Sequence, residues 1–290
     1  MGKLIRCITS NGQVMATAVD STDICAKAEQ YHKTSAVVTA AMGRLLTATS
    51  MMGNMLKGKD NSITVRVAGG GPVGSIICAA DFNGDVRGYV TNPVVELPLN
   101  EKGKLDVGTA VGKSGNIYVL KDLGLKEPYN GMTPLVSGEI AEDVTAYYAL
   151  SEQTPTVCAL GVLVSPDLSV KKAGGYIIQL LPAAEEETIK KLEDGIKDIA
   201  SVTGMLSEGL SPEDIIRRAL KNFEVEVLYE QNVEYKCNCS KERIEKALLS
   251  MGKKELSEMA EEMEKAEIAC HFCDKKYVFT KAELKALEKN

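Results

Sequence analysis

The sequence predicts an α+β protein with three parts: a mainly antiparallel sheet packed with helices, a helical linker, and a small C-terminal α+β domain. Three observations support this prediction. Short β-prone runs and Gly-rich turns dominate residues 1–182, charged amphipathic stretches fill 183–230, and two close pairs of cysteines lie in 231–290. At 290 residues, the chain is long enough for two or three domains.

The sheet of the N-terminal part is predicted from its β-prone runs, which span residues 63–71, 73–82, 86–93, 154–164 and 168–182. Asn83-Gly84 between two of these runs is a strong signal for a hairpin. Ser165-Pro166-Asp167 marks another turn between two runs. Strands joined by such short turns pair in antiparallel fashion, which favours an antiparallel sheet over a doubly wound one.

Two helices are predicted to pack on this sheet. Residues 33–57 are apolar on most faces of a helix, which is typical of a buried helix. Residues 137–153 form the second helical stretch. The first helix carries several methionines that could form an adaptable binding face, but we expect core packing; they are Met42, Met51, Met52 and Met55.

The linker is predicted to consist of short helices that depend on a neighbouring surface. One stretch has a narrow apolar stripe at helical spacing, made of Ile189, Leu192, Ile196 and Ile199. In the next stretch, Ser211 suits an N-cap, Pro212 suits the first helical position and Asp214 follows three residues after the cap. Short, charged helices with so little apolar area must pack against something else to stay folded.

The C-terminal part, residues 231–290, is highly charged, with 12 acidic and 12 basic residues. Helices are predicted at 241–251, 254–266 and 281–289. So small and polar a domain buries too little apolar area to be stable unaided, and it therefore needs a cross-link or a metal ion.

Composition excludes several classes of function. The net charge of −6 argues against a general nucleic-acid binder, which needs a basic surface. We expect neither a secretory signal nor a membrane span, and hence a cytoplasmic protein with reduced cysteines. Two histidines, His32 and His271, give almost no material for Ser-His-Asp or Cys-His catalysis, so we expect no enzyme. Residues 69–74 contain G-x-G-x-x-G, but a β-prone run follows where a dinucleotide site needs a helix.

Cys237-Asn238-Cys239 and Cys270-His271-Phe272-Cys273 are separated by 30 residues (240–269). Thiolates favour Zn²⁺, which takes four ligands in a tetrahedron, so we expect one zinc ion per chain on these four cysteines. With the four positions filled, His271 is interpreted as a solvated turn residue. The other four cysteines are isolated in apolar surroundings and are expected to pack as small hydrophobic residues; they are Cys7, Cys25, Cys78 and Cys158.

The same spacing permits a second chemistry. Each pair is close enough in sequence to form a local disulfide, and the zinc-binding thiolate is also the form that oxidants attack. Basic residues flank the pairs and are expected to favour the thiolate: Lys236, Lys241, Arg243, Lys275 and Lys276. Oxidation to Cys237–Cys239 and Cys270–Cys273 would eject the ion and remove the tie between the two segments. The residues alone leave open whether the site is a permanent staple or such a switch.

Tyr235-x-Cys237-x-Cys239-Ser240, followed after 30 residues by Cys270-x-Phe272-Cys273, closely resembles the C-terminal signature of the heat shock protein 33 family of redox-regulated, ATP-independent holdase chaperones. Residues 137–155 and 174–182 also resemble stretches of that family in the expected order. The resemblance covers the whole chain and keeps all four ligand positions.

This resemblance implies that the reduced, zinc-bound form is compact and poorly active. Oxidants such as hypochlorite, or peroxide with mild heat, would form the two disulfides, release zinc and unfold the zinc domain and the linker at 183–230. The active form would be a homodimer that holds unfolding client proteins through the unfolded linker and apolar patches of the N-terminal domain. Reductants would reverse the process before clients pass to ATP-dependent foldases.

Two other hypotheses remain. A constitutive, zinc-stapled module could bind protein or nucleic acid without switching, although a nucleic-acid reader should be basic. A thiol–disulfide oxidoreductase is suggested by Cys270-x-x-Cys273, but that motif belongs at a strand-to-helix turn of a thioredoxin-like fold.

Overall fold

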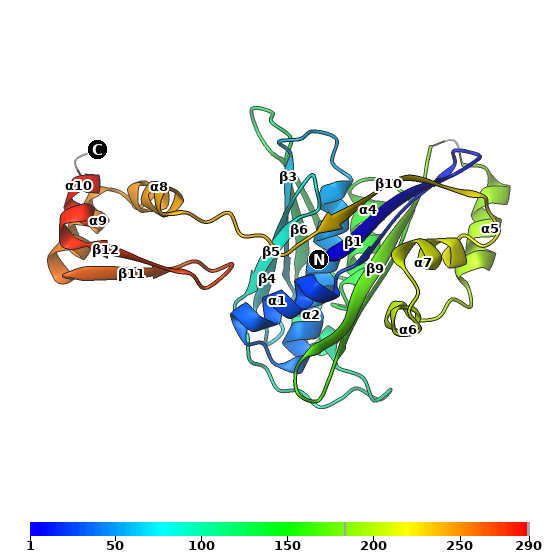
Figure 1. Ribbon diagram of the computed structural model, residues 1–290, viewed down its shortest axis with the longest axis horizontal. Coiled ribbons are helices and arrows are strands. Elements are labelled where there is room, and N and C mark those ends of the chain that lie inside the picture. The colour runs from blue at the N-terminus through cyan, green and yellow to red at the C-terminus, as the bar shows by residue number, and fades with distance from the viewer. Residues whose placement is uncertain (183, 289–290) are drawn as a thin grey trace. The chain divides into compact units, whose positions relative to one another are not determined.

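The computed structural model describes residues 1–182 and 184–288, and Figure 1 shows the order of its helices and strands. Contacts between residues divide the chain into an N-terminal unit, Met1–Lys236, and a C-terminal unit, Cys237–Asn290. Within the described residues, the N-terminal unit holds two five-stranded antiparallel sheets, and the C-terminal unit holds a two-stranded one. The predicted α+β class with antiparallel sheets is confirmed.

The first sheet combines the two ends of the N-terminal unit. In spatial order it contains β10 (Val225–Val233), β1 (Gly2–Thr9), β2 (Val14–Asp20), β9 (Val170–Leu180) and β8 (Thr156–Val164). The predicted hairpin across residues 165–167 is formed by β8 and β9. Strand β10 pairs with β1 along its length, from Gly2 opposite Val233 to Thr9 opposite Val225. Residues 225–230, which were predicted to belong to the helical linker, are therefore part of an edge strand of this sheet.

The second sheet is built from the middle of the chain. In spatial order it contains β5 (Val86–Val90), β4 (Ser75–Asp81), β3 (Ser62–Ala68), β6 (Asn116–Asp122) and β7 (Tyr129–Pro134). The predicted Asn83-Gly84 turn joins β4 to β5, and Gly84 adopts a φ of +82°, which favours glycine. Residues 69–74 join β3 directly to β4, so no helix follows the glycine motif.

Helix α2 (Ala36–Asn54) lies between the two sheets and packs on β4 and β5 of one and on β8 and β9 of the other (Figure 1). The predicted helix over 33–57 is thus confirmed with narrower bounds. Lys33, in the left-handed region at φ +51°, ends the preceding helix α1 (Thr22–His32). Met51 and Met52 are buried in the main core, as expected.

Helix α4 (Ala141–Leu150) begins later than the predicted 137–153, because the residues before it wrap around a buried carboxylate. Asp143 accepts hydrogen bonds from the backbone N–H groups of Val136, Ser137 and Ile140 at 2.7, 3.1 and 2.9 Å. These bonds satisfy donors that a longer helix would have used. A short helix, α3 (Val107–Val111), lies on the other side of α2.

The linker helices cover the face of the first sheet that is turned away from α2 (Figure 1). They are α5 (Glu186–Ile196), α6 (Val202–Ser207) and α7 (Pro212–Ala219). The predicted cap of α7 is formed: Ser211 Oγ accepts from Asp214 N–H, and the Asp214 carboxylate accepts from Ser211 N–H. Leu192, Met205 and Ile216 are buried against the sheet. These contacts place the helices within the N-terminal unit, while the domain boundaries after 182 and 230 stay predictions.

The C-terminal unit has a small core of its own. Its elements are α8 (Lys241–Met251), α9 (Lys253–Glu262), β11 (Lys265–Ala269), β12 (Lys276–Thr280) and α10 (Lys281–Glu288). The predicted helix over 254–266 is wrong at its end, because Ala266 pairs with Phe279 in the β11–β12 hairpin and is buried there. Thr280 and Glu283 form a capping box at the start of α10, within the predicted helix over 281–289.

Replacing Ile216 by alanine tests the dependence of the linker on the sheet. Ile216 is fully buried between α7 and the sheet, so Ile216→Ala should lower the free energy of unfolding by about 2–5 kcal/mol and expose the linker to protease. Arg218→Ala, an exposed change in the same helix, is the matched control. Equal protection of both variants in limited proteolysis and denaturant melts would contradict this dependence.

Candidate metal centre

Two separate segments of the C-terminal unit supply the four cysteine side chains. Cys237 and Cys239 lie in the irregular segment before α8, whose N-cap Ser240 accepts a hydrogen bond from Arg243 N–H at 3.3 Å. Cys270 and Cys273 lie in the turn that joins β11 to β12. Because the β11–β12 hairpin and the start of α8 are both regular local structures, each pair has a defined position within its own segment.

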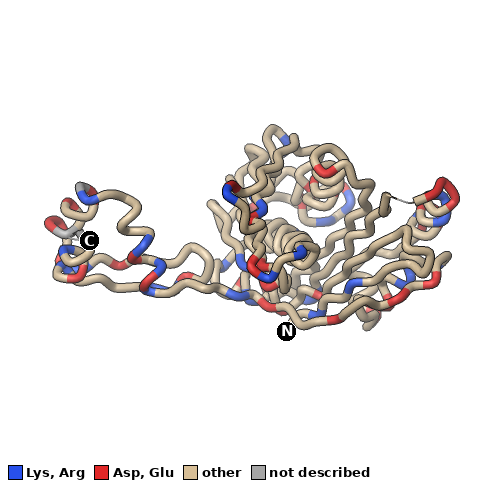
Figure 2. The backbone as a smooth tube through the Cα atoms, turned by 90° about the horizontal axis from the view of Figure 1, so that it is seen from above, with Lys and Arg blue, Asp and Glu red and all other residues tan. Residues whose placement is uncertain are grey.

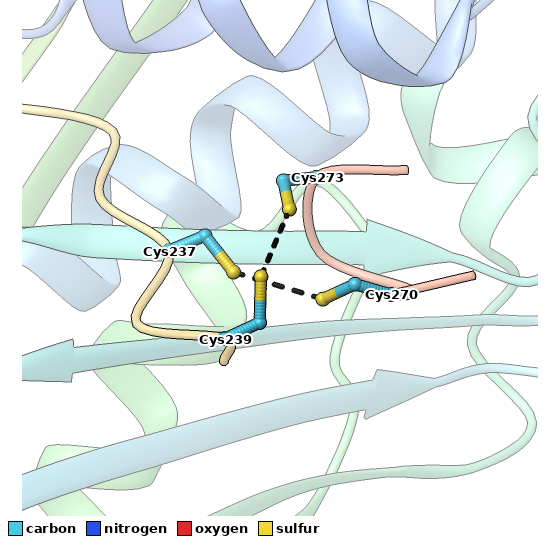
Figure 3. A group of neighbouring side chains, drawn as sticks. All are labelled: Cys237, Cys239, Cys270 and Cys273. Atoms are coloured by element: carbon cyan, nitrogen blue, oxygen red, sulfur yellow. Dashed lines mark hydrogen bonds between the residues drawn. The ribbon is translucent and has the colours of Figure 1, made fainter. Parts of the chain in front are cut away.

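The C-x-x-C turn is closed by backbone hydrogen bonds. Cys270 N–H donates to Lys275 O at 2.9 Å, and Asp274 N–H donates to Cys270 O at 2.8 Å. Asp274 adopts the left-handed conformation, at φ +57°, which aspartate tolerates better than most residues. The turn therefore presents both of its sulfurs to the segment that carries Cys237 and Cys239 (Figure 3).

The four sulfur atoms lie within 4.8 Å of one another, which confirms that the sequence pairs come together. Cys237 Sγ is 3.7 Å from Cys270 Sγ, and Cys239 Sγ is 3.4 Å from Cys273 Sγ. A regular tetrahedron of thiolates around zinc, with Zn–S of about 2.3 Å, requires sulfur–sulfur separations of about 3.8 Å. Cys270 is buried and the other three are half-buried. The residues present thus fit a tetrahedral, thiolate-binding metal ion.

Burial and hydrogen bonding shift the pKa values of these thiols in opposite directions. Burial raises the pKa of Cys237 and of Cys273 above the ordinary value. Burial also acts to raise the pKa of Cys239, but hydrogen bonds from Tyr277 and from the three other thiols lower it to about 7. Among these thiols, Cys239 is therefore the one whose surroundings favour the thiolate.

The lysines that flank the cysteines interact mainly with carboxylates. Lys241 Nζ is 2.5 Å from Glu283 Oε1, Lys276 Nζ is 2.7 Å from Glu267 Oε1, and Lys236 Nζ is 2.6 Å from Asp85 Oδ2. These three lysines therefore form ion pairs with carboxylates, whereas the sequence predicted that their charge would favour the cysteine thiolates. Acidic and basic residues alternate along the C-terminal unit, without a continuous basic stretch in its described part (Figure 2).

Tyr277 was not predicted as part of this site. Its hydroxyl donates to Cys239 Sγ at 3.1 Å, and it comes from β12, on the same side of the hairpin as Phe279, which is buried. The alternation of Tyr277 and Phe279 in a strand would have indicated an inward-facing tyrosine. The hydroxyl reaches the sulfur only because the cysteine segment folds over the hairpin.

Tyr235 anchors the chain to the N-terminal unit just before the first cysteine. Its hydroxyl donates to Gly88 O at 2.7 Å, and it lies 3.3 Å from His32 Nε2. Lys236 N–H donates to Val86 O at 2.9 Å. Residues 235–236 are therefore fixed to strand β5, and Cys237 follows directly.

The other four cysteines do not take part in the cluster. Cys7, Cys25 and Cys78 are buried and Cys158 is partly buried. Burial raises the pKa of Cys7 to about 11 and that of Cys25 to about 12, which keeps both as neutral thiols. Their expected role as small core residues is in accord with these positions.

Among the described residues, none of the helices has the length and the apolar character needed to cross a membrane.

Comparison with known proteins agrees with this arrangement. The family model described as "Hsp33 protein" matches residues 2–280, which include both cysteine pairs. The chain is 51% identical over 281 residues to the "33 kDa chaperonin" of Clostridioides difficile, covering 97% of this chain and 96% of that protein. It is 49% identical over 285 residues to the "33 kDa chaperonin" of Oceanobacillus iheyensis, covering 98% of each.

A solved structure is similar over the same extent. The crystal structure of the 33 kDa chaperonin (heat shock protein 33 homolog) from Thermotoga maritima superimposes with a TM-score of 0.89 at 37% identity, covering 99% of this chain and 97% of that one. Sequence, fold and cysteine cluster lead to one assignment: the chain belongs to the Hsp33 family of chaperones.

Proposed function

We propose that the protein is a redox-regulated, ATP-independent holdase of the cytoplasm that binds unfolding proteins under oxidative stress. The observation that carries the proposal is the convergence of four thiols, from segments 30 residues apart, to within 4.8 Å. Such a cluster suits both a zinc ion and oxidation to disulfides. The Hsp33 family assignment supports the chaperone activity.

In the reduced form, Cys237, Cys239, Cys270 and Cys273 would hold one Zn²⁺. Metal binding contributes on the order of 10–16 kcal/mol to small metal-folded domains. The core of the C-terminal unit consists of few apolar side chains, among them Leu248, Leu256, Phe279 and Leu284. A core of this size does not replace such a contribution, so the unit should be folded only while the four thiols hold the ion.

Oxidation converts the ligands into disulfides. Formation of Cys237–Cys239 or Cys270–Cys273 would take two electrons from two thiolates. Hypochlorite with two protons would accept them and give chloride and water, or peroxide with two protons would give two molecules of water, and the oxidised pair would no longer hold a metal ion. A disulfide stabilises a fold mainly by lowering the conformational entropy of the unfolded chain. The local disulfides, which close loops of three and four residues, would contribute only about 1.6–1.9 kcal/mol in this way. A Cys237–Cys270 disulfide, which closes 34 residues, would contribute about 3.8 kcal/mol. Local disulfides thus leave the two segments untied and the C-terminal unit unfolded.

Unfolding of the C-terminal unit would destabilise the linker, because the two are joined by a short segment of the chain. Cys237 directly follows the anchor at Tyr235 and Lys236, which in turn follows β10. Helices of 11, 6 and 8 residues are too short to persist alone once their surroundings loosen. Their release would expose the apolar sheet face that they cover, including Ile5, Val14, Tyr176 and Ile178. That face and the unfolded linker would hold clients.

The family resemblance further supports a homodimer as the active form, reversal by reductants and transfer of clients to ATP-dependent foldases. The assignment to a chaperone family is consistent with a function other than catalysis.

A constitutive, zinc-stapled module is the second candidate. One observation favours it: close sulfur contacts of 3.7 and 3.4 Å join one pair to the other, from Cys237 to Cys270 and from Cys239 to Cys273. Disulfides formed along those contacts would keep the segments tied, and oxidation would then leave the unit folded.

Chelation of the metal should unfold the C-terminal unit alone. With the reduced protein, a strong chelator should collapse the amide NMR signals of residues 237–288 toward random-coil positions while those of the two large sheets keep their dispersion. Metal analysis must show that the ion has left. If the metal-free protein keeps dispersed signals for residues 237–288, the claim that the C-terminal unit needs the metal ion to fold is wrong.

Oxidation should activate the protein. Light scattering from a heat-unfolding client should be suppressed by hypochlorite-treated protein and not by reduced, zinc-loaded protein. Cys158→Ser, at an isolated cysteine, should behave like the natural chain, whereas Cys270→Ser should lose the dependence on oxidant. Peptide mapping should find local disulfides; equal activity of the two forms, or cross-paired disulfides in an active protein, would contradict the switch.

A further inference from the structure

A cavity of about 670 Å³ lies in the N-terminal unit between the first sheet and the linker. Its walls come from the start of α2, the loop before α3, strand β8 and the first residues of α6. This volume is within the range of about 300–1,000 Å³ that small-molecule sites occupy. The cavity shares no residue with the cysteine cluster.

The apolar walls leave surface that the protein itself does not cover. They include Leu99, Leu105, Leu160, Val162 and Val202. Leu105, Leu160 and Val162 pack against the main core but are only partly buried, and Leu99 is 59% exposed. An apolar ligand in the cavity would therefore remove further apolar surface from water.

Helix α6 approaches β8 closely at one edge of the cavity. A side chain on Gly161 would meet Thr203 Cγ2 at 2.7 Å, so glycine at this position permits the approach. Both residues line the cavity. One wall thus belongs to the sheet and the facing wall to the linker.

The charged residues that line the described cavity are both basic, Arg44 and Lys104. Arg44 Nη1 is bound to Glu139, through its side chain and through its carbonyl at 3.2 Å, while Arg44 Nε is buried without a hydrogen-bond acceptor in the described structure. Lys104 is placed by a tight turn, in which its N–H donates to Asn100 Oδ1 at 3.0 Å. Because Glu139 matches the charge of Arg44, the positive charge that the cavity offers to a ligand comes from Lys104, which is exposed.

We propose that this cavity binds an amphipathic carboxylate, with its alkyl chain along β8 and the start of α6 and its carboxylate at Lys104. Complementary charge favours an anionic head group, and the apolar walls favour a hydrocarbon tail. Such a ligand would touch both the sheet and the linker helix.

A ligand that needs both walls stabilises the form in which the linker is docked, because it binds that form and not the released one. Amphipathic carboxylates should therefore delay activation. This effect on activation rests on the proposed function, whereas binding to the reduced protein does not.

Calorimetry with reduced, zinc-loaded full-length protein tests the site, with decanoate as the probe and decanol as its uncharged counterpart. Decanoate should bind saturably, at one site, roughly two- to fivefold more tightly than decanol. Lys104→Met should weaken decanoate by roughly two- to fivefold and leave decanol unchanged. Lys102→Met, in the same turn but not lining the cavity, is the matched control.

Three results of the calorimetry would overturn the proposed site. Absence of saturable decanoate binding removes the site, equal binding of decanoate and decanol makes it a purely apolar groove, and equal effects of the two lysine changes place the anion elsewhere. After hypochlorite treatment, decanoate should slow proteolysis of residues 184–224 in the natural chain more than in Lys104→Met. If decanoate binds as expected but oxidation releases no linker, the redox proposal fails and the binding site stands.

Discussion

In the proposed function, the fold of the C-terminal unit depends on one constraint: four sulfur atoms from two segments that are distant in the sequence must stay together. The hairpin β11–β12 and helix α8 are each defined by local hydrogen bonds, and besides the cysteines they are joined by a small apolar core and by Lys241, whose ammonium lies over the Phe279 ring. Tyr277 adds a single hydrogen bond to Cys239. A structure whose two halves meet mainly at thiols responds to whatever reacts with thiols, which is the physical basis of the proposed switch.

The N-terminal unit, unlike the C-terminal unit, has a large apolar core. This difference determines which parts of the chain would unfold in the proposed switch. Its two sheets enclose α2 in a large core with buried residues from both sheets. The linker helices add a thinner layer on the outer face of the first sheet. Under the proposed switch, unfolding of the C-terminal unit would leave this core in place, and the layer that would detach from it is the linker, which is next in sequence. The cavity is lined both by β8 of the first sheet and by α6 of the linker. A ligand bound there could therefore alter how readily the linker helices are released from the sheet.

Local signals were predicted well from the sequence, and long-range pairings were not. The cap at Ser211 and Asp214, the Asn83-Gly84 turn and the two cysteine pairs each lie within a few residues, so their chemistry can be recognised in the sequence. Strands β1 and β10 were missed, because their pairing joins Gly2 to Val233 across almost the whole unit. The late start of α4 and the role of Tyr277 depend on where a buried carboxylate and a hydroxyl find partners, which spacing alone does not determine.

Amide hydrogen exchange, compared between the reduced, zinc-loaded protein and the hypochlorite-treated protein, tests the central claim most directly. The account predicts that oxidation abolishes protection in residues 237–288 and in α5, α6 and α7, while α2 and the strands around it keep theirs. Retained protection in the linker helices, in a protein whose four thiols are oxidised and whose metal is gone, would contradict it.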